Sequence, residues 1–464
     1  MRPGGALARA GGGLSASAAI ATAALVVGLG ALAGATGDQI PLAFAVAATG
    51  AFLGLVIIKV RSSREDVVFL CTIFLLGVLL RCLIALVNHY LLPAGTFAMD
   101  DGRYNQVGQQ LVAYWEGRGS YPGYIAHTTQ AGWFYVNGAI YWLWGFVPLV
   151  PAFLNCVIGP LTAVYVFYLC RETFGRDTAL RAGLLAMFFP SLMLWSSINL
   201  KDALTVFAIV MILSNALELQ HRLSFQRFAL LLVFMALLGT LRSYLFVLVG
   251  FSIVASLAMG KLGVSFRGLI LATVLLVGFV GLYQKYGFGS DVVESDGLET
   301  VNMLRGELAE GGSVYGMESE IATPLGALTY LPKGLAYFLL APAPWQIFNL
   351  RQALTFPEML IWYCLLPAVW LGVRHTLKFH FRPAIMLMAF TTVLTVAYAL
   401  VETNLGTAYR HRAQVLVVYL IFAAVGLAER SRRRAEDGNL NSAWSAPAQA
   451  GLPAQTGAAP AAGS

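Results

Sequence analysis

The sequence predicts an all-α, polytopic membrane protein with about twelve transmembrane helices. Hydrophobic residues make up 58% of the 464 residues and charged residues 11%, against about 25% charged residues in soluble domains. Mean hydropathy is +0.72, and apolar runs of about 20 residues, the length that crosses a bilayer, recur along the chain. This composition excludes a disordered chain, a collagen-like repeat and an ordinary soluble enzyme.

The apolar runs define the expected spans in chain order. The first run follows Arg2 and Arg9 and is interpreted as a retained helix, although Ala31-Leu32-Ala33 also fits a signal-peptide cleavage site. The predicted spans are 14–36, 41–60, 67–92, 152–170, 178–196, 200–218, 228–241, 243–259, 269–287, 357–373, 383–401 and 413–429.

Two further apolar stretches are expected to be juxtamembrane or re-entrant helices rather than spans. Residues 131–149 are rich in Trp and Tyr, whose rings prefer the membrane interface. Residues 325–345 contain three prolines, and proline removes helix hydrogen bonds that lipid cannot replace.

This topology explains the net charge of +7, which comes from 30 Lys+Arg against 23 Asp+Glu. Basic connections fall on the same side as the N-terminus, so this side and both termini are expected to be cytoplasmic. The excess charge therefore reports orientation, and no nucleic-acid partner is expected. These connections are Lys59–Arg64, Arg171–Arg181, Arg222–Arg227, Lys261–Arg267, Arg374–Arg382 and Arg430–Arg434.

The chain divides into four expected parts. They are N-terminal membrane helices (1–66), a core (67–220) with an external loop (93–151), C-terminal membrane helices (221–429) with an external loop (288–356), and a basic, then disordered, cytoplasmic tail (430–464). The cysteines lie in apolar runs without metal-ligand spacing and are interpreted as buried, inert thiols: Cys71, Cys82, Cys156, Cys170 and Cys364.

Two adjacent carboxylates, Asp100 and Asp101, open the first external loop. Beside a membrane such a carboxylate can act as a general base or bind a metal ion. The plainer interpretation is a solvated start of a loop. No metal signature is decisive, so a divalent cation stays an open possibility and no cofactor is assigned.

Several cations are also expected on the external side, against the positive-inside trend. Lys201 precedes a helix whose dipole disfavours it, which suggests an anionic ligand, although a surface pair with Asp202 or a snorkelling lysine also fits. Arginine forks match phosphate oxygens, so Arg242, Arg410, His411 and Arg412 are assigned to a lipid phosphate. A misplaced helix would instead put the last three inside. Substrate contacts are assigned to Tyr104, His127, Tyr244 and Glu402 on the same face.

These motifs resemble the GT-C membrane glycosyltransferases, especially bacterial family-39-like proteins related to protein O-mannosyltransferases. The resemblance covers roughly residues 67–220. It rests on the Asp-Asp-x-x-Tyr stretch from Asp100 to Tyr104, an aromatic helix followed by a turn at Gly145, the helix ending at Tyr168–Gly175, and Phe189-Pro190-Ser191 followed by Ser196–Asp202.

The resemblance implies a GT-C-like fold and a sugar donor linked to a polyprenyl phosphate such as undecaprenyl phosphate. Asp100 would deprotonate an acceptor hydroxyl, which attacks the anomeric carbon with inversion, Asp101 would assist or replace it, and Lys201 would hold the donor phosphate. The acceptor would be a glycan, lipid or protein at the periplasmic face of the bacterial cytoplasmic membrane. The His-Pro-Pro or Lys-Pro-Pro element of such loops is absent from 126–133, which argues against a standard protein mannosyltransferase.

Two other functions fit the same features. An O-antigen ligase or polysaccharide polymerase also uses arginines for a lipid pyrophosphate, and long lipid-linked polymers as donors would separate it from the first hypothesis. A transporter of lipid-linked sugars predicts inverted repeats and ionisable residues near the bilayer midplane. Most of the informative charges lie at one face, which disfavours this last alternative. Arg81 lies inside a predicted span, and three interpretations of it stay open: an internal pair, a part of the site, or a bend in the apolar run.

Overall fold

The structure is a computed structural model that describes residues 39–93, 95–97, 100–126, 128, 130–222, 224–259, 277–278, 281, 297–309, 314–316, 321, 323–346 and 350–445. Within these ranges the chain is helical, and its β pairing is limited to a bridge between Val314 and Asn404. The predicted all-α class is confirmed.

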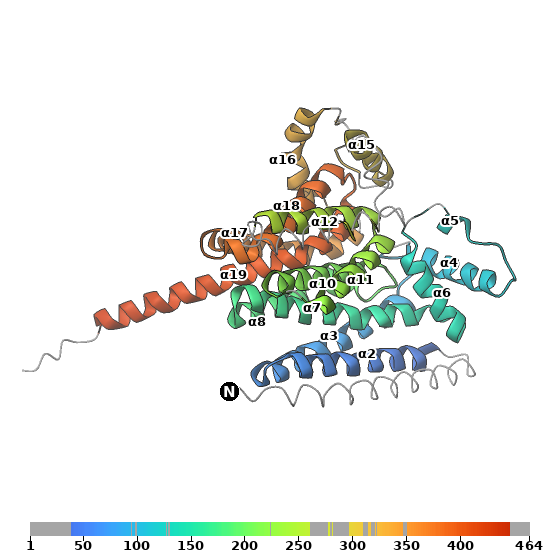
Figure 1. Ribbon diagram of the computed structural model, residues 1–464, viewed down its shortest axis with the longest axis horizontal. Helices are drawn as coiled ribbons and strands as arrows, with labels where there is room; N and C mark the ends of the chain where they lie inside the picture. Colours follow the sequence, from blue (N-terminus) through green and yellow to red (C-terminus); the bar gives the residue numbers. More distant parts are fainter. Residues whose placement is uncertain are drawn as a thin grey trace, which may run out of the picture.

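Seven of the described helices are long and apolar enough to cross a membrane, and two shorter apolar helices accompany them. Most of them lie side by side along one direction (Figure 1). The seven helices are α2 (Gln39–Arg61), α3 (Arg64–Tyr90), α7 (Leu149–Phe174), α10 (Asp202–His221), α17 (Leu350–Phe379), α18 (Phe381–Val401) and α19 (Leu405–Ser445), and the shorter ones are α11 (Phe225–Leu241) and α12 (Ser243–Met259).

This architecture is that of an integral membrane protein, and the predicted spans can be compared with it only where residues are described. The predicted span 14–36 and most of 269–287 lie outside the described residues. The predicted span 178–196 is wrong as a single helix, because it divides into α8 (Arg176–Phe188) and α9 (Pro190–Trp195). The residue before a proline avoids the helical region, and Phe189 has ψ 126°.

The two stretches interpreted as non-spanning form shorter helices. Helix α6 (Gly132–Trp144) has 13 residues and is therefore about 20 Å long, less than the hydrocarbon core of about 30 Å. It gathers with α4 (Asp100–Trp115) and α5 (Gly123–Ala126) at one end of the bundle (Figure 1). Helix α16 (Pro324–Leu340) lies beside α15 (Gly297–Leu308) on one side of the bundle, and the 3-10 helix Pro344–Gln346 follows it.

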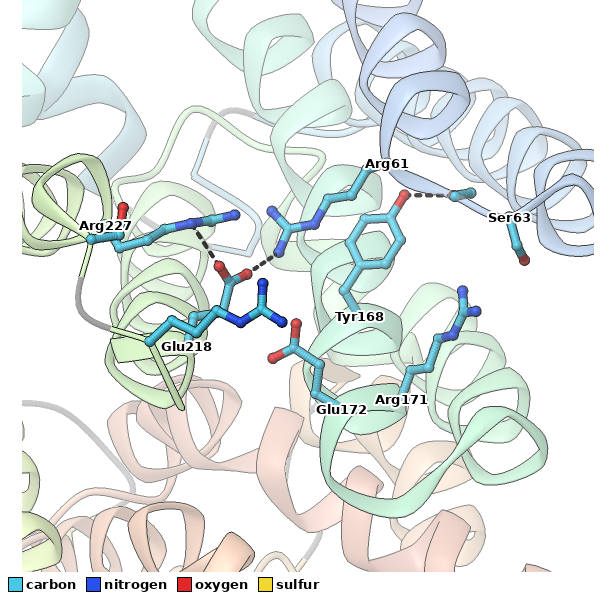
Figure 2. A pocket seen from close by; sticks show the side chains of 10 residues that line it. Arg61, Ser63, Tyr168, Arg171, Glu172, Glu218 and Arg227 are labelled. Carbon is cyan, nitrogen blue, oxygen red and sulfur yellow. Dashed lines mark hydrogen bonds and ion pairs between the residues drawn. The ribbon is translucent and has the colours of Figure 1, made fainter. Parts of the chain in front are cut away.

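The bundle has two chemically different ends. Helices α2, α7, α10, α17 and α19 all run toward the same end, where the chain turns at basic segments, and we call this the basic end. Figure 2 shows part of it, with arginines projecting from several helices. At the opposite end α3 leads into α4, α11 into α12 and α18 into α19; we call this the site end. Among the described residues, the basic connections and the charged candidate site residues thus lie at opposite ends of the bundle.

The core of the bundle confirms part of the expectation for the cysteines. All five are free thiols; Cys82, Cys156 and Cys170 are buried and Cys71 is half-buried. Cys364 on α17 is exposed, so it was wrong to expect five buried thiols, and the apolar sequence around it marks a face turned away from the rest of the protein.

Helices α17 and α19 approach each other closely at two glycines. A Cβ atom added at Gly426 would lie 1.9 Å from the backbone oxygen of Ala368, and one at Gly372 would lie 1.8 Å from that of Phe422. Small residues at such crossings let helix backbones touch in membranes, where packing rather than the hydrophobic effect drives association.

We expect Gly426→Ala to cost about 1–3 kcal/mol of stability, because the added methyl group meets backbone atoms that no side-chain rotation can move. The measurement is the thermal unfolding midpoint of the purified chain in detergent. Gly306→Ala is the matched control, since a Cβ there meets nothing within 4 Å, and its midpoint should not fall. An unchanged midpoint for Gly426→Ala would contradict this packing of α17 on α19.

Candidate functional site

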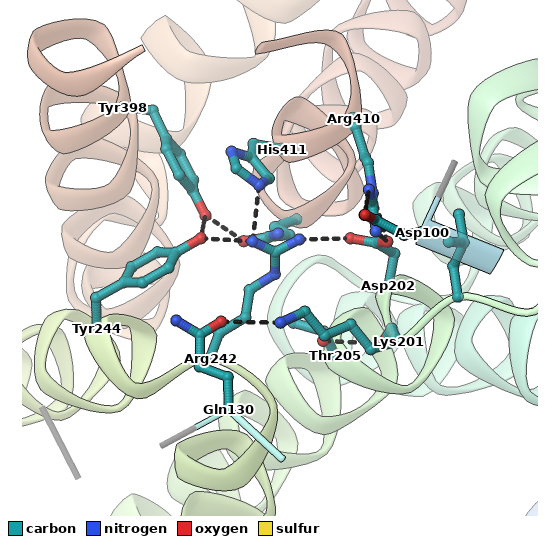
Figure 3. Close-up of polar contacts among 12 residues, drawn as sticks. Asp100, Gln130, Lys201, Asp202, Thr205, Arg242, Tyr244, Tyr398, Arg410 and His411 are labelled. Atoms are coloured by element: carbon teal, nitrogen blue, oxygen red, sulfur yellow. Dashed lines mark hydrogen bonds and ion pairs between the residues drawn. The ribbon is translucent and has the colours of Figure 1, made fainter. Parts of the chain in front are cut away.

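A cluster of charged side chains lies at the site end, where several helices begin or end. Asp100 is the first residue of α4, Asp202 the first of α10, and Arg242 joins α11 to α12. Arg410 and His411 lie in the second turn of α19. Segments far apart in the chain thus supply one continuous set of polar contacts (Figure 3).

Asp202 is the centre of this cluster. Its Oδ2 accepts a hydrogen bond from Arg410 Nε at 2.6 Å and lies 2.5 Å from Nη2 of the same guanidinium, and its Oδ1 accepts a hydrogen bond from Arg242 Nη2 at 2.8 Å. Arg410 Nη1 also donates to Asp100 Oδ2 at 2.6 Å. The side chain of Asp202 is only 1% exposed, so two guanidinium groups neutralise a carboxylate that is removed from water.

His411 extends the cluster to Glu402. Arg242 Nη1 lies 2.7 Å from His411 Nε2, and because a guanidinium can only donate, Nε2 accepts. The other nitrogen, Nδ1, then carries the proton and donates it to Glu402 Oε1. Glu402 is fully buried and also accepts a hydrogen bond from Thr407 at 2.8 Å. The predicted substrate contact Glu402 thus lies behind the imidazole of His411 and is not exposed to the surface of the site.

Two tyrosines border the cluster on its other side. Arg242 Nη1 donates to the Tyr244 hydroxyl at 2.9 Å, and the hydroxyls of Tyr244 and Tyr398 lie 3.2 Å apart. Tyr398 hydrogen-bonds in turn to Gln414. Tyr244 is a predicted site residue, whereas Tyr398 and Gln414 lie within apolar helices and have no sequence signal of their own.

Lys201 stands beside the cluster without an ion pair to Asp202. Its Nζ donates to Gln130 Oε1 at 2.8 Å. Burial, together with the neighbouring charges of Arg242 and Arg410, lowers the pKa of Lys201 well below its ordinary value, against the opposing effect of Asp202. An anion placed next to this ammonium group would favour its charged form and raise the pKa again.

The two adjacent carboxylates of α4 differ in their surroundings. Burial acts to raise the pKa of Asp100, but the charge and hydrogen bond of Arg410 outweigh it and the pKa is lowered. For Asp101 burial dominates and raises the pKa to about 6, although hydrogen bonds from Asn105 and Asn199 oppose the shift. Two neighbours in sequence thus have different acidities.

A network of side-chain amides lies behind Asp101. Asn105 donates to Asp101 Oδ1 at 3.2 Å, and Asn199 donates to the amide oxygens of Asn105 and Asn137, each at 2.8 Å. Trp133 Nε1 donates to Asn199 Oδ1 at 2.8 Å. This network fixes α4, α6 and the start of α10 against one another. The sequence did not predict these asparagines as site residues, because they have no characteristic spacing.

The remaining predicted residues lie elsewhere. Arg412 faces away from the cluster, since two residues along a helix rotate a side chain by about 200°. Its Nε donates to the carbonyl of Phe338 at 2.8 Å and its Nη2 to that of Ala341, so it binds the end of α16. Tyr104 is buried against Phe134 in an apolar cluster. His127 lies outside the described residues.

Arg81 and the carboxylates bear on two open questions from the sequence. Arg81 is fully buried inside α3, and its guanidinium donates to Ser196 Oγ at 2.7 Å and to the carbonyls of Met187 and Gly77 at 2.9 and 3.1 Å. Among the described residues no three His, Cys, Asp or Glu side chains group as metal ligands. The carboxylates of Asp100 and Asp202 are held by arginine instead.

We expect Asp202→Asn to lower the stability of the chain by about 3–5 kcal/mol, because it leaves two buried guanidinium groups with too little negative charge. The fall is measured as a lower thermal unfolding midpoint. Asp177→Asn, at an exposed position on α8, removes the same charge and should change stability by no more than about 0.5 kcal/mol. Equal midpoints for the two variants would contradict the central role of Asp202.

Comparisons with known proteins bear on the fold. No protein-family model and no curated protein matches the chain. The crystal structure of ArnT from Cupriavidus metallidurans bound to undecaprenyl phosphate is 15% identical, has a TM-score of 0.51, and matches 82% of this chain and 64% of that one. The chain thus matches less than two thirds of the length of ArnT.

Two structures from Archaeoglobus fulgidus are less similar. The oligosaccharyltransferase AglB in complex with an inhibitory peptide and a dolichol-phosphate is 16% identical with a TM-score of 0.44, and the apo oligosaccharyltransferase is 15% identical with a TM-score of 0.43. Each match covers 80% of this chain and 52% of the other. The closer relationship to family-39 proteins stays a prediction. The likeness to ArnT shows the fold, and the chain has the GT-C-like helical architecture that its sequence predicts.

Proposed function

We propose that this protein is an inverting glycosyltransferase that moves a sugar from a polyprenyl-phosphate donor to an acceptor hydroxyl. The observation that carries the proposal is the meeting of Arg410, Arg242 and Lys201 at the site end, beside the carboxylate of Asp100. The basic end would face the cytoplasm, so the reaction would occur at the external face of a bacterial cytoplasmic membrane. The fold is shared with ArnT, whose structure holds undecaprenyl phosphate.

The donor phosphate would enter the cluster at Arg410. The side chain of Arg410 is 14% exposed, which makes it more accessible than Arg242 at 7%. A phosphate oxygen competes with Asp100 for Nη1 of Arg410, while Asp202 keeps the rest of that guanidinium in place. Lys201 would add its charge from the side of Gln130. The phosphate would thereby take the place of the Asp100 carboxylate on Arg410, because the two parallel N–H groups of a guanidinium match phosphate oxygens.

Release from Arg410 would prepare Asp100 as the general base. The side chain of Asp100 is 40% exposed, so an acceptor at the surface of the cluster could approach its carboxylate. Asp100 would take the proton of the acceptor hydroxyl as the acceptor oxygen forms its bond to the anomeric carbon. The bond from that carbon to the phosphate oxygen breaks on the opposite face, so the configuration inverts. Polyprenyl phosphate leaves with the electron pair, and the fixed cations stabilise the charge that develops on it.

The alternatives differ in their donors and in where they need charge. An O-antigen ligase or polymerase would use the same arginines for a lipid-linked polymer, and comparing such polymers with monosaccharide-phosphate lipids as donors separates the two. A transporter needs ionisable groups along a path through the membrane. Arg81 lies inside α3, but Ser196 and two carbonyls engage its guanidinium, which supports a structural role.

We expect Asp100→Asn to slow sugar transfer by about 10²–10⁴-fold, the usual effect of removing a general base. The assay follows the release of polyprenyl phosphate from labelled lipid-phosphate sugars in membranes that contain the protein. Asp177→Asn serves as the control for the loss of one carboxylate and should keep full activity. Full activity of Asp100→Asn would remove this residue as the base.

The pH dependence distinguishes Asp100 from Asp101. With Asp100 as base, kcat/KM should be nearly constant from pH 7.5 to 5, because the pKa of Asp100 is lowered and the carboxylate stays ionised. With Asp101 as base, activity should fall by about half at pH 6 and about tenfold at pH 5, since its pKa is raised to about 6 and protonation removes the base. If wild-type activity falls in this second way and Asp101→Asn is inactive, the base is Asp101 and not Asp100.

A further inference from the structure

A cavity lined by several arginines lies far from the candidate site, at the basic end. Its volume is about 700 Å³, within the range of about 300–1,000 Å³ that is common for ligand pockets. Four arginines line it, Arg61, Arg171, Arg222 and Arg227, against the two carboxylates Glu172 and Glu218. The lining therefore carries an excess of two positive charges. Figure 2 shows the lining, with three of the arginines and both carboxylates labelled.

Glu218 holds two of the arginines in position and leaves donors free. Arg61 Nη2 and Arg227 Nε each bind one of its oxygens at 2.6 Å. The guanidinium of Arg61 also lies over the rings of Tyr165 and Tyr168, 5.2 and 5.0 Å from their centroids. Each guanidinium has five N–H donors, so most of them remain for a further acceptor. The two forks are thus preorganised around a shared carboxylate.

The other two arginines differ in their engagement. Arg171 Nη1 binds the buried Asp66 at 2.7 Å. Arg222 follows the end of α10, is exposed, and makes no ion pair within the described ranges. Hydroxyl groups complete the lining; the hydroxyls of Ser62 and Tyr168 lie 2.8 Å apart. Guanidinium forks beside hydroxyls are the donor set that binds phosphate oxygens.

Exposed apolar side chains are next in sequence to two residues of the lining. Val60 precedes Arg61 and is 76% exposed, and Phe225 follows Ser224 and is 86% exposed. Both lie at the ends of membrane-crossing or apolar helices, where acyl chains would contact them. Clusters of arginine and lysine at this level attract anionic lipids of the cytoplasmic leaflet.

We propose that this cavity binds the phosphate headgroup of an anionic membrane lipid, with Arg61, Arg222 and Arg227 as its donors. The site would operate whether or not the opposite end transfers a sugar. Its chemistry is that of a phosphate oxygen held by several guanidinium groups, which a free phosphate ion would share, so the experiment includes both ligands.

The test titrates the purified full chain in detergent with phosphatidylglycerol and, separately, with phosphatidylcholine, and counts bound lipids by native mass spectrometry. Wild-type protein should bind phosphatidylglycerol in preference to phosphatidylcholine. Arg222→Gln should weaken that binding at least about tenfold, because it removes charge-assisted hydrogen bonds to the phosphate. Arg222→Glu should weaken it further. The unfolding midpoint without added lipid checks the fold, and it should stay unchanged because Arg222 is exposed and makes no ion pair within the described ranges.

Arg382→Gln is the matched control, since Arg382 is exposed at the same end of the bundle but does not line the cavity. Its affinity should stay within about twofold of wild type. Equal losses for Arg222→Gln and Arg382→Gln, or no loss for either Arg222 variant, would overturn the proposal. Inorganic phosphate is added in a competition arm. Displacement of the lipid by micromolar phosphate would overturn the assignment to a lipid and indicate a free-anion site.

Discussion

The buried carboxylate of Asp202 neutralises two arginines, and the arrangement of the site end depends on this interaction. Burying a charge is costly unless it is paired, and Asp202 is the carboxylate that both Arg242 and Arg410 share in the protein interior. The three side chains come from the start of α10, the α11–α12 junction and the second turn of α19. Electrostatics thereby fixes the relative positions of helix ends that are remote in sequence.

The same interaction reconciles two demands on the site. In the proposed reaction, the cations that would bind a phosphate must be kept in place before it arrives, and the carboxylates of Asp202 and Asp100 would do this. Asp202 is buried, whereas Asp100 is partly exposed and would be the partner that the phosphate displaces. The guanidinium of Arg410 would therefore have a structural partner in Asp202 and a replaceable partner in Asp100.

Charge placement was the most predictable part of this protein. The apolar runs and the positive-inside trend were sufficient to place Asp100, Lys201, Arg242 and Arg410 at one end. The sequence did not distinguish Arg410 from Arg412, because a helix that starts at Leu405 turns them to opposite sides, and the register of that helix is a tertiary property.

Other parts were less accessible from the sequence, for physical reasons. Asn199 and Tyr398 act through partners that are 94 and 154 residues away in the chain, and the local sequence around a single polar residue does not reveal such partners. The break at Phe189 did have a signal in Pro190, but hydropathy averages over it. Length and composition therefore predict that a helix exists better than they predict where it is interrupted.

Arg410 and Arg412 anchor the first turns of α19 on two opposite sides. The guanidinium of Arg410 binds the charged cluster, and that of Arg412 binds the carbonyls at the end of α16. A rotation of α19 about its axis would move both guanidinium groups at once and in opposite directions. The position of α16 and that of Arg410 therefore both depend on the rotation of α19, although Arg410 and Arg412 do not connect the two sites by a direct contact.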